Sequence, residues 1–127
     1  MTASSKQVMI VEDEESLRKA LVKKFTSEGF RTLEANDGKK GLEIALVQHP
    51  DIILLDIIMP EMDGMSFLRE IRLDAWGKKV PIILLTNLYD AENIAAAHQK
   101  KVFDYLIKSD WQLGDIVKKV KDKLDLK

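Results

Sequence analysis

The sequence contains no cysteine, which excludes disulfide bonds and thiolate metal sites. This absence is compatible with a reducing cytoplasm, where we expect the protein to act. No apolar run approaches the roughly 18 residues that a membrane-spanning helix needs. The first seven residues also lack the apolar stretch of a signal peptide. We therefore expect no membrane association.

The chain also lacks an excess of one charge and any glycine-rich nucleotide motif. Its net charge of −1 gives no electrostatic footprint for direct nucleic-acid binding. Neither a P-loop nor a dinucleotide glycine pattern is present, so a nucleotide has no obvious binding loop. The 127 residues are 46% hydrophobic and 32% charged, without repeats or linkers. This composition predicts one globular domain, residues 1–127.

Four short aliphatic runs each end in polar residues. Runs of this kind are typical of strands buried on both faces of a parallel sheet. They end in Glu12 and Asp13 after residues 8–11, in Asp56 after 52–55, in Thr86 after 82–85 and in Lys108 after 105–107. In an open parallel sheet, ligands bind outside the carboxyl ends of the strands. We therefore expect these side chains to meet in one cleft.

Strand and helix patterns alternate along the chain. A further strand is expected at about residues 30–34, and helices at 14–28, from a cap at Asp37 to His49, at 66–72, from Asp90 to about Lys101, and after a cap at Ser109 or Asp110. In this scheme Asp63 and Gly64 form a turn. Five strands and five helices predict a doubly wound α/β fold. Right-handed crossovers and a switch point beside the first strand favour the strand order 2-1-3-4-5.

This strand order predicts a metal site. The first and third strands become neighbours, so the carboxylates of Glu12, Asp13 and Asp56 come together. Clustered carboxylates repel one another and attract a hard cation. Mg²⁺ accepts such oxygen ligands together with waters and a substrate phosphate. The backbone carbonyl of Ile58, two residues after Asp56, is positioned to add a ligand.

Lys108 and Thr86 add groups suited to a phosphoryl ligand. The lysine can pair with a phosphoryl oxygen or with Asp56, and the threonine hydroxyl can donate one hydrogen bond. Each residue alone has a plainer explanation: Asp56 as a turn former, Glu12 and Asp13 at the positive end of a helix dipole, Thr86 and Lys108 as surface groups. Their coincidence at matched strand ends favours a shared function.

The chain resembles the receiver domains of two-component response regulators over essentially its whole length. The resemblance lies in residues 8–14, 54–64, 81–86 and 105–108. The pattern Asp-x-x-Met-Pro-x-Met-Asp-Gly that begins at Asp56 is its most specific part. It implies a flavodoxin-like fold and a phosphorylation-dependent signalling switch. Such a domain is not a conventional enzyme but a phosphoacceptor that catalyses its own phosphorylation and dephosphorylation.

The resemblance also implies roles for single residues and for partners. The roles are phosphoacceptor at Asp56, Mg²⁺ ligands at Glu12, Asp13 and Asp56, switch residues at Thr86 and Tyr105, and phosphate pairing at Lys108. The implied donor is a phosphohistidine on a sensor histidine kinase or on a histidine phosphotransfer protein. The output partner is unknown. The changing surface comprises the fourth helix, fifth strand and fifth helix, and it is also a candidate dimer surface.

Two other classes of function are alternatives. One is an interaction module with the receiver fold that works without phosphorylation, against which the complete set of site residues argues. The other is a Mg²⁺-dependent phosphohydrolase, which would need a second aspartate where Ile58 stands and a cap domain that the chain has no room for. The sequence names no kinase, signal or target. It also leaves open the oligomeric state, the phosphoryl lifetime and whether the domain stands alone.

Overall fold

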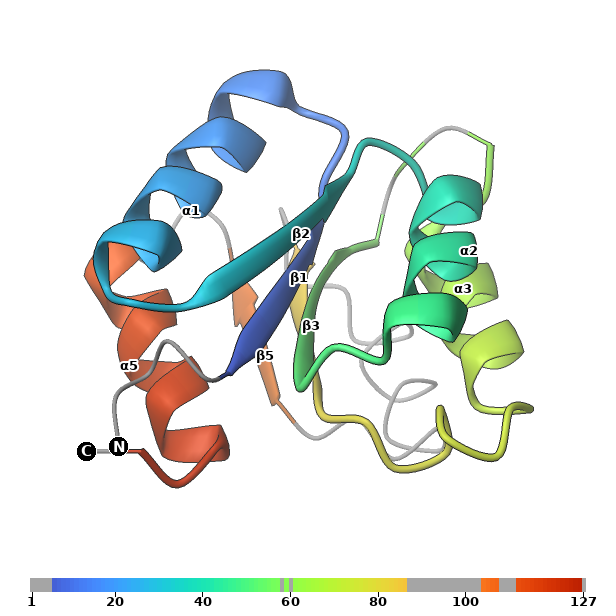
Figure 1. The fold of residues 1–127 in the computed structure, drawn as a ribbon. Coiled ribbons are helices and arrows are strands. Elements are labelled where there is room, and N and C mark those ends of the chain that lie inside the picture. Colours follow the sequence, from blue (N-terminus) through green and yellow to red (C-terminus); the bar gives the residue numbers. More distant parts are fainter. Residues whose placement is uncertain (1–5, 58, 60, 87–103, 108–111, 127) are drawn as a thin grey trace.

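A computed structural model describes residues 6–57, 59, 61–86, 104–107 and 112–126, with the backbone alone at 86 and 104–107. Within these residues the chain forms a parallel sheet between two layers of helices (Figure 1). No helix in this described part is long and apolar enough to cross a membrane.

The sheet has the order β2-β1-β3-β4-β5, and all its pairs are parallel. Its strands are β1 (Gln7–Val11), β2 (Arg31–Ala35), β3 (Ile52–Asp56), β4 (Ile82–Thr86) and β5 (Asp104–Ile107). The order reverses direction between β1 and β3, which is the switch point of a doubly wound fold. The α/β class predicted from the sequence is confirmed, and the sheet has the expected order.

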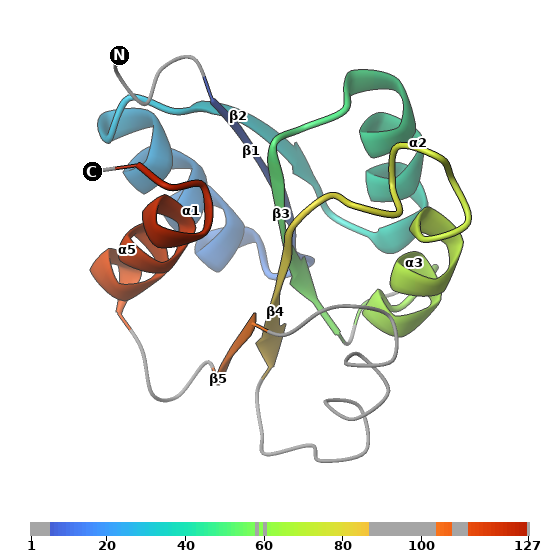
Figure 2. The same cartoon turned by 90° about the horizontal axis from the view of Figure 1, so that it is seen from below.

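Four helices are described: α1 (Glu15–Ser27), α2 (Gly38–Gln48), α3 (Gly64–Ile71) and α5 (Leu113–Lys123). Helices α1 and α5 cover one face of the sheet, and α2 and α3 cover the other (Figures 1 and 2). The fourth predicted helix, from Asp90 to about Lys101, lies outside the described residues.

The two-sided burial of the sheet explains the continuous aliphatic runs. Val8 and Ile10 of β1 belong to the core beneath α1 and α5, whereas Met9 and Val11 belong to the core beneath α2 and α3. Residues of β3 alternate in the same way between the two cores. Successive side chains of a strand point to opposite faces, so a strand covered on both faces must be apolar at every position.

Helix starts depend on single side chains. Asp37 caps α2 as predicted, because its Oδ1 accepts a hydrogen bond from the Lys40 amide at 2.8 Å. The turn predicted at Asp63 and Gly64 is instead the start of α3. Asp63 accepts from the Ser66 amide at 2.8 Å, so the helix begins two residues earlier than expected.

The predicted cap of the last helix, Ser109 or Asp110, is wrong. Helix α5 begins at Leu113 with Gln112 as its N-cap residue. The Asp115 carboxylate accepts a hydrogen bond from the Gln112 amide at 2.7 Å. This bond satisfies one of the amides that a helix start leaves without a partner. The sequence pattern placed the start too early because several residues before Leu113 can also cap a helix.

An ion pair joins the C-terminal cap of α1 to α5, between partly exposed side chains. Lys121 Nζ lies 3.0 Å from Glu28 Oε1, and Lys24 Nζ lies 3.6 Å from Glu28 Oε2. The hydrogen bond and the charge of Lys121 lower the pKa of Glu28 below its ordinary value of 4.5. A carboxyl with a lowered folded-state pKa stabilises the fold above its unfolded pKa, and this stabilisation is lost as pH falls through the folded pKa.

We therefore predict a pH-dependent effect of Glu28→Gln. At pH 7 the variant should melt roughly 1–3 °C below wild type, the size expected for an exposed ion pair. The gap should close as pH falls below the folded-state pKa of Glu28. Thermal melts by circular dichroism from pH 7 to pH 3 measure this gap, with Glu43→Gln at an exposed position of α2 as the control. A gap that persists unchanged at pH 3 would contradict this assignment.

Candidate functional site

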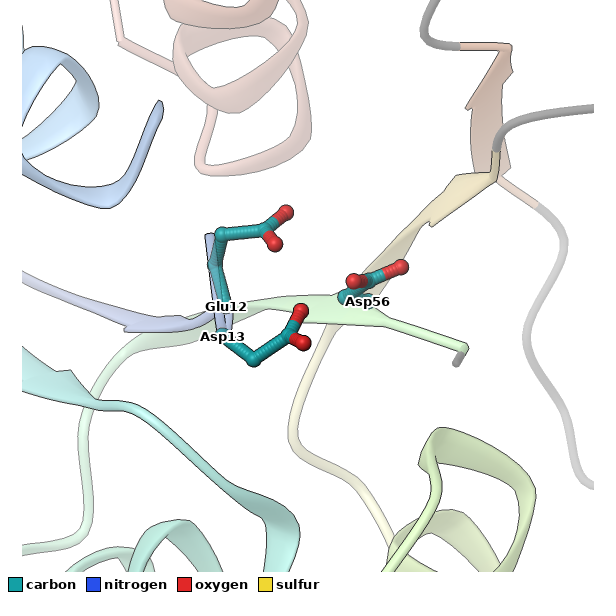
Figure 3. A group of neighbouring side chains, drawn as sticks. All are labelled: Glu12, Asp13 and Asp56. Carbon is teal, nitrogen blue, oxygen red and sulfur yellow. The ribbon is translucent and has the colours of Figure 1, made fainter. Parts of the chain in front are cut away.

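Three carboxylates meet where β1 and β3 end (Figure 3). Glu12 and Asp13 directly follow β1, and Asp56 is the last residue of β3. Val11 pairs in register with Leu55, so the two strands end at the same level. Each of the three residues offers a carboxylate oxygen, and these oxygens all lie within 4.8 Å of one another. The sequence-predicted acidic cluster is therefore present.

The cluster is mostly shielded from solvent. Glu12 is 0% exposed and Asp56 is 3% exposed, whereas Asp13 is exposed. Three negative charges this close together repel one another, and low solvent access strengthens that repulsion. A cation among them would relieve it.

The donor set fits Mg²⁺. All three groups are hard carboxylate oxygens, which Mg²⁺ prefers over nitrogen and sulfur. Octahedral ligands at about 2.1 Å from the ion are at most about 4.2 Å apart. A spread of up to 4.8 Å therefore suits direct bonds from one or two carboxylates, with water or a small inward shift completing the shell. Mg²⁺ usually binds proteins in this way.

Three hydrogen bonds hold Glu12 in place. Its amide donates to the Ala35 carbonyl on β2 at 3.0 Å, which continues the pairing of β1 with β2 for one residue. Its Oε2 accepts from the Glu14 amide at 3.0 Å. Arg18 Nη1 donates to the Glu12 carbonyl oxygen at 3.1 Å. Main chain and side chain of Glu12 are thus both anchored.

The segment after β3 turns back onto Asp56. The Gly64 amide donates to the Ile57 carbonyl at 2.7 Å. A Cβ atom at Gly64 would overlap the Asp56 carbonyl oxygen and would lie 2.7 Å from the Ile57 Cα. Only glycine allows the start of α3 to pack this closely on the backbone of the strand end. In the same loop, Glu61 has a left-handed φ of 68°, which non-glycine residues rarely adopt.

The other predicted site residues fall on β4 and β5 or beside them. Thr86 is the last residue of β4 and pairs with Ile107 on β5, and Tyr105 pairs with Leu84. The structure thus brings the Thr86 backbone to the same edge of the sheet as Asp56, which pairs with Leu85. Ile58 and Lys108 lie outside the described residues.

Sequence patterns missed two supports of the site. The first is Gly64: the sequence predicts only a turn there, whereas its packing on Asp56 and Ile57 is what requires glycine. The second is Arg18, whose charge gives no sign of burial but which is a buried residue of α1 together with Leu21 and Phe25. The spacing 18, 21, 25 is that of a buried helix face, and this spacing could have identified it.

Comparisons with known proteins agree with this geometry. The family model described as the response regulator receiver domain matches residues 8–121. The chain belongs to this family, the receiver domains of two-component response regulators. This membership places it in phosphorylation-based two-component signalling and confirms the resemblance seen in the sequence.

Two curated relatives show how much of a longer protein the match covers. The regulatory protein AtoC of Escherichia coli is 40% identical over 108 residues, which are 85% of this chain and 23% of AtoC. The KDP operon transcriptional regulatory protein KdpE of Escherichia coli is 37% identical over 101 residues, 80% of this chain and 44% of KdpE. The chain thus spans about a quarter to under half of these relatives.

Solved structures show the same fold. The chemotaxis response regulator CheY4 of Vibrio cholerae superposes with a TM-score of 0.85 at 25% identity, covering 92% of this chain and 97% of CheY4. The receiver domain of the sensor histidine kinase PA1611 of Pseudomonas aeruginosa has a TM-score of 0.82 at 29% identity, covering 92% and 95%. That structure is described with a magnesium ion coordinated in its active site cleft.

The close packing of α3 on β3 generates a prediction. Gly64→Ala should destabilise the fold by about 1–3 kcal/mol, the usual effect of overpacking, because the backbone of Asp56 and Ile57 must shift. Gly114→Ala is the matched control near the start of α5, where an added Cβ meets nothing within 4 Å. It should be neutral or stabilising by up to about 1 kcal/mol. Urea unfolding measures both, and equal stabilities of the two variants would refute the packing argument.

Proposed function

We propose that this domain is a phosphorylation-dependent signalling switch in which Asp56 accepts the phosphoryl group. One observation carries the proposal: Asp56 is 3% exposed, and carboxylate oxygens of Glu12 and Asp13 lie within 4.8 Å. Gathering buried negative charges is unfavourable for stability unless a cation compensates them. Such an arrangement at the ligand-binding edge of the sheet supports a chemical role over a structural one.

The proposed phosphoryl donor is a phosphohistidine on a sensor histidine kinase or a histidine phosphotransfer protein. A carboxylate oxygen of Asp56 attacks the phosphorus, and the phosphorus–nitrogen bond breaks. The electron pair of that bond returns to the imidazole nitrogen of the donor. Later attack by water on the aspartyl phosphate restores the carboxylate and releases inorganic phosphate. The domain itself promotes this hydrolysis.

We propose that Glu12, Asp13 and Asp56 hold Mg²⁺, with the backbone carbonyl of Ile58 as a further ligand. When bound, the ion offsets the negative charges of the attacking carboxylate and the phosphoryl oxygens. The protein contributes the fixed position of the carboxylates. The hydrogen bond from the Glu14 amide to Glu12 Oε2 supports this assignment, since it orients that carboxylate before any ligand arrives.

Residues of β4 and β5 are proposed to transmit the change. The Lys108 ammonium would pair with the phosphoryl group, and the Thr86 hydroxyl would donate to one of its oxygens. A shift of Thr86 toward the phosphoryl group would open space for the Tyr105 ring. The output surface, and a candidate dimer surface, would then be the fourth predicted helix with β5 and α5. The identity of the output partner depends on the rest of the protein.

Phosphorylation can be tested with acetyl phosphate as a small-molecule donor. In the presence of Mg²⁺ the intact mass should rise by about 80 Da, the mass of one phosphoryl adduct. Asp56→Asn should abolish the gain because the nucleophilic carboxylate is removed. Asp51→Asn is a matched control near the other end of β3, where the carboxylate instead accepts from the Gln7 amide at 2.8 Å. It should be labelled like wild type.

Two outcomes would contradict the assignment of Asp56 or the role of Mg²⁺. Robust labelling of Asp56→Asn at another residue would reassign the nucleophile. Equal labelling in excess chelator would show that the phosphorylation does not require Mg²⁺. Binding of an output partner that is the same with and without acetyl phosphate would instead favour the phosphorylation-independent interaction module.

Metal binding is tested by neutralising two carboxylates. Glu12→Gln combined with Asp13→Asn should weaken Mg²⁺ binding at least tenfold, since most of the charge of the site is lost. In chelator the double variant should melt at or above the temperature of wild type, because mutual repulsion is relieved. Calorimetric titration and thermal melts provide the two measurements.

A control separates local ligands from general surface charge. Glu14→Gln combined with Glu15→Gln removes the same charge from exposed positions at the start of α1. This variant should change the Mg²⁺ affinity much less, because exposed charges are screened. If Glu12→Gln combined with Asp13→Asn binds Mg²⁺ like wild type, then Glu12 and Asp13 are not ligands of the proposed metal site.

A further inference from the structure

Arg18 is the only buried cationic residue among those whose side chains the structure describes. It is 9% exposed and lies on α1, on the helix face that also buries Leu21 and Phe25. Removing a guanidinium from water is unfavourable unless its donors are satisfied. Its hydrogen bonds therefore show why it is held there.

The guanidinium joins three parts of the chain. Arg18 Nε donates to Glu34 Oε1 on β2 at 2.9 Å, and Nη1 donates to the Glu12 carbonyl oxygen at 3.1 Å. Nη2 lies 4.0 Å from Glu15 Oε1, a carboxylate that is mostly exposed. Because a guanidinium is planar and rigid, the bond to Glu34 fixes the direction in which Nη1 points. Glu34 itself is fixed in the sheet, where it pairs with Ile10.

The Glu12 carbonyl belongs to the peptide that connects Glu12 to Asp13. Its orientation therefore influences where both carboxylates point. The amide of Glu12 belongs to the preceding peptide, which the Ala35 carbonyl of β2 holds. The Glu12–Asp13 peptide is instead held by Arg18 through the Glu12 carbonyl. Asp13 itself is exposed, which makes its direction more dependent on the backbone.

We infer that Arg18 is a positioning residue for the carboxylate cluster: its rigid guanidinium, anchored by Glu34, holds the Glu12–Asp13 peptide in the orientation that binds Mg²⁺. This inference rests on the proposed function, in which that cluster is the metal site. Groups that orient metal ligands without touching the metal commonly change metal affinity 10- to 100-fold when they are removed.

Charge and geometry make opposite predictions for Arg18. A nearby positive charge repels Mg²⁺, so a purely electrostatic role means that removing the charge tightens binding. A positioning role means that losing the two-point contact weakens binding even when the charge is kept. Arg18→Lys separates the two effects, because an ammonium is a point charge that cannot reproduce the planar fork.

The experiment measures Mg²⁺ affinity by calorimetric titration of the folded domain, well below its melting temperature. Arg18→Lys should weaken binding about tenfold, and Arg18→Met should also weaken it despite losing a positive charge. Lys19→Met, an exposed neighbour on α1, is the control for charge and should stay within about twofold of wild type. Circular dichroism of each variant confirms that it is folded.

A second variant covers the case in which Arg18 variants do not fold. Glu34→Asp keeps every charge but shortens the side chain that accepts the Arg18 Nε hydrogen bond. It should therefore weaken Mg²⁺ binding several-fold. It should also shift the amide resonance of Asp13, whose peptide carries the carbonyl that Arg18 contacts. If the Arg18 variants fold, wild-type affinity in both Glu34→Asp and Arg18→Lys, or tighter binding by Arg18→Met, would overturn the inference. If they do not fold, wild-type affinity in Glu34→Asp alone would overturn it. A wild-type domain that binds no Mg²⁺ at millimolar concentration would instead refute the proposed function.

Discussion

The site depends on the parallel pairing of β1 with β3. Val11 and Leu55 are opposite each other in register, so Glu12, Asp13 and Asp56 follow at one level despite more than forty residues between them. A slip of one residue would turn every side chain of the strand to the opposite face. Both faces are buried under helices, so a slip would move each side chain into the other of two differently packed cores. The hydrophobic core therefore sets the spacing of the carboxylates.

The packing that places the carboxylates also opposes their charges. Glu12 and Asp56 are almost fully buried beside Asp13, an arrangement in which a bound cation would relieve the repulsion between the carboxylates. Stability is supplied elsewhere, by the apolar layers and by caps such as Asp37 and Asp63. This separation suits a switch, because the charge of the site can change while the core stays packed.

Contacts to the backbone of the strand ends hold the edge of the site. The start of α3 packs on the Asp56 backbone through Gly64, and α1 reaches the Glu12 carbonyl through Arg18. Each helix thereby contacts the end of a different central strand. Movement of either helix would therefore shift the position of a carboxylate. These contacts physically connect the site with the surface of the domain.

The sequence by itself determined the α/β class, the strand order and the acidic cluster, because four-residue aliphatic runs ending in polar residues have few alternatives in a parallel sheet. It did not determine the starts of α3 and α5, where several residues can cap and only the observed bonds of Asp63 and Asp115 decide. The role of Gly64 and the burial of Arg18 were likewise decided by tertiary structure. Both depend on which backbone atoms lie opposite them, and residues distant in sequence supply those atoms.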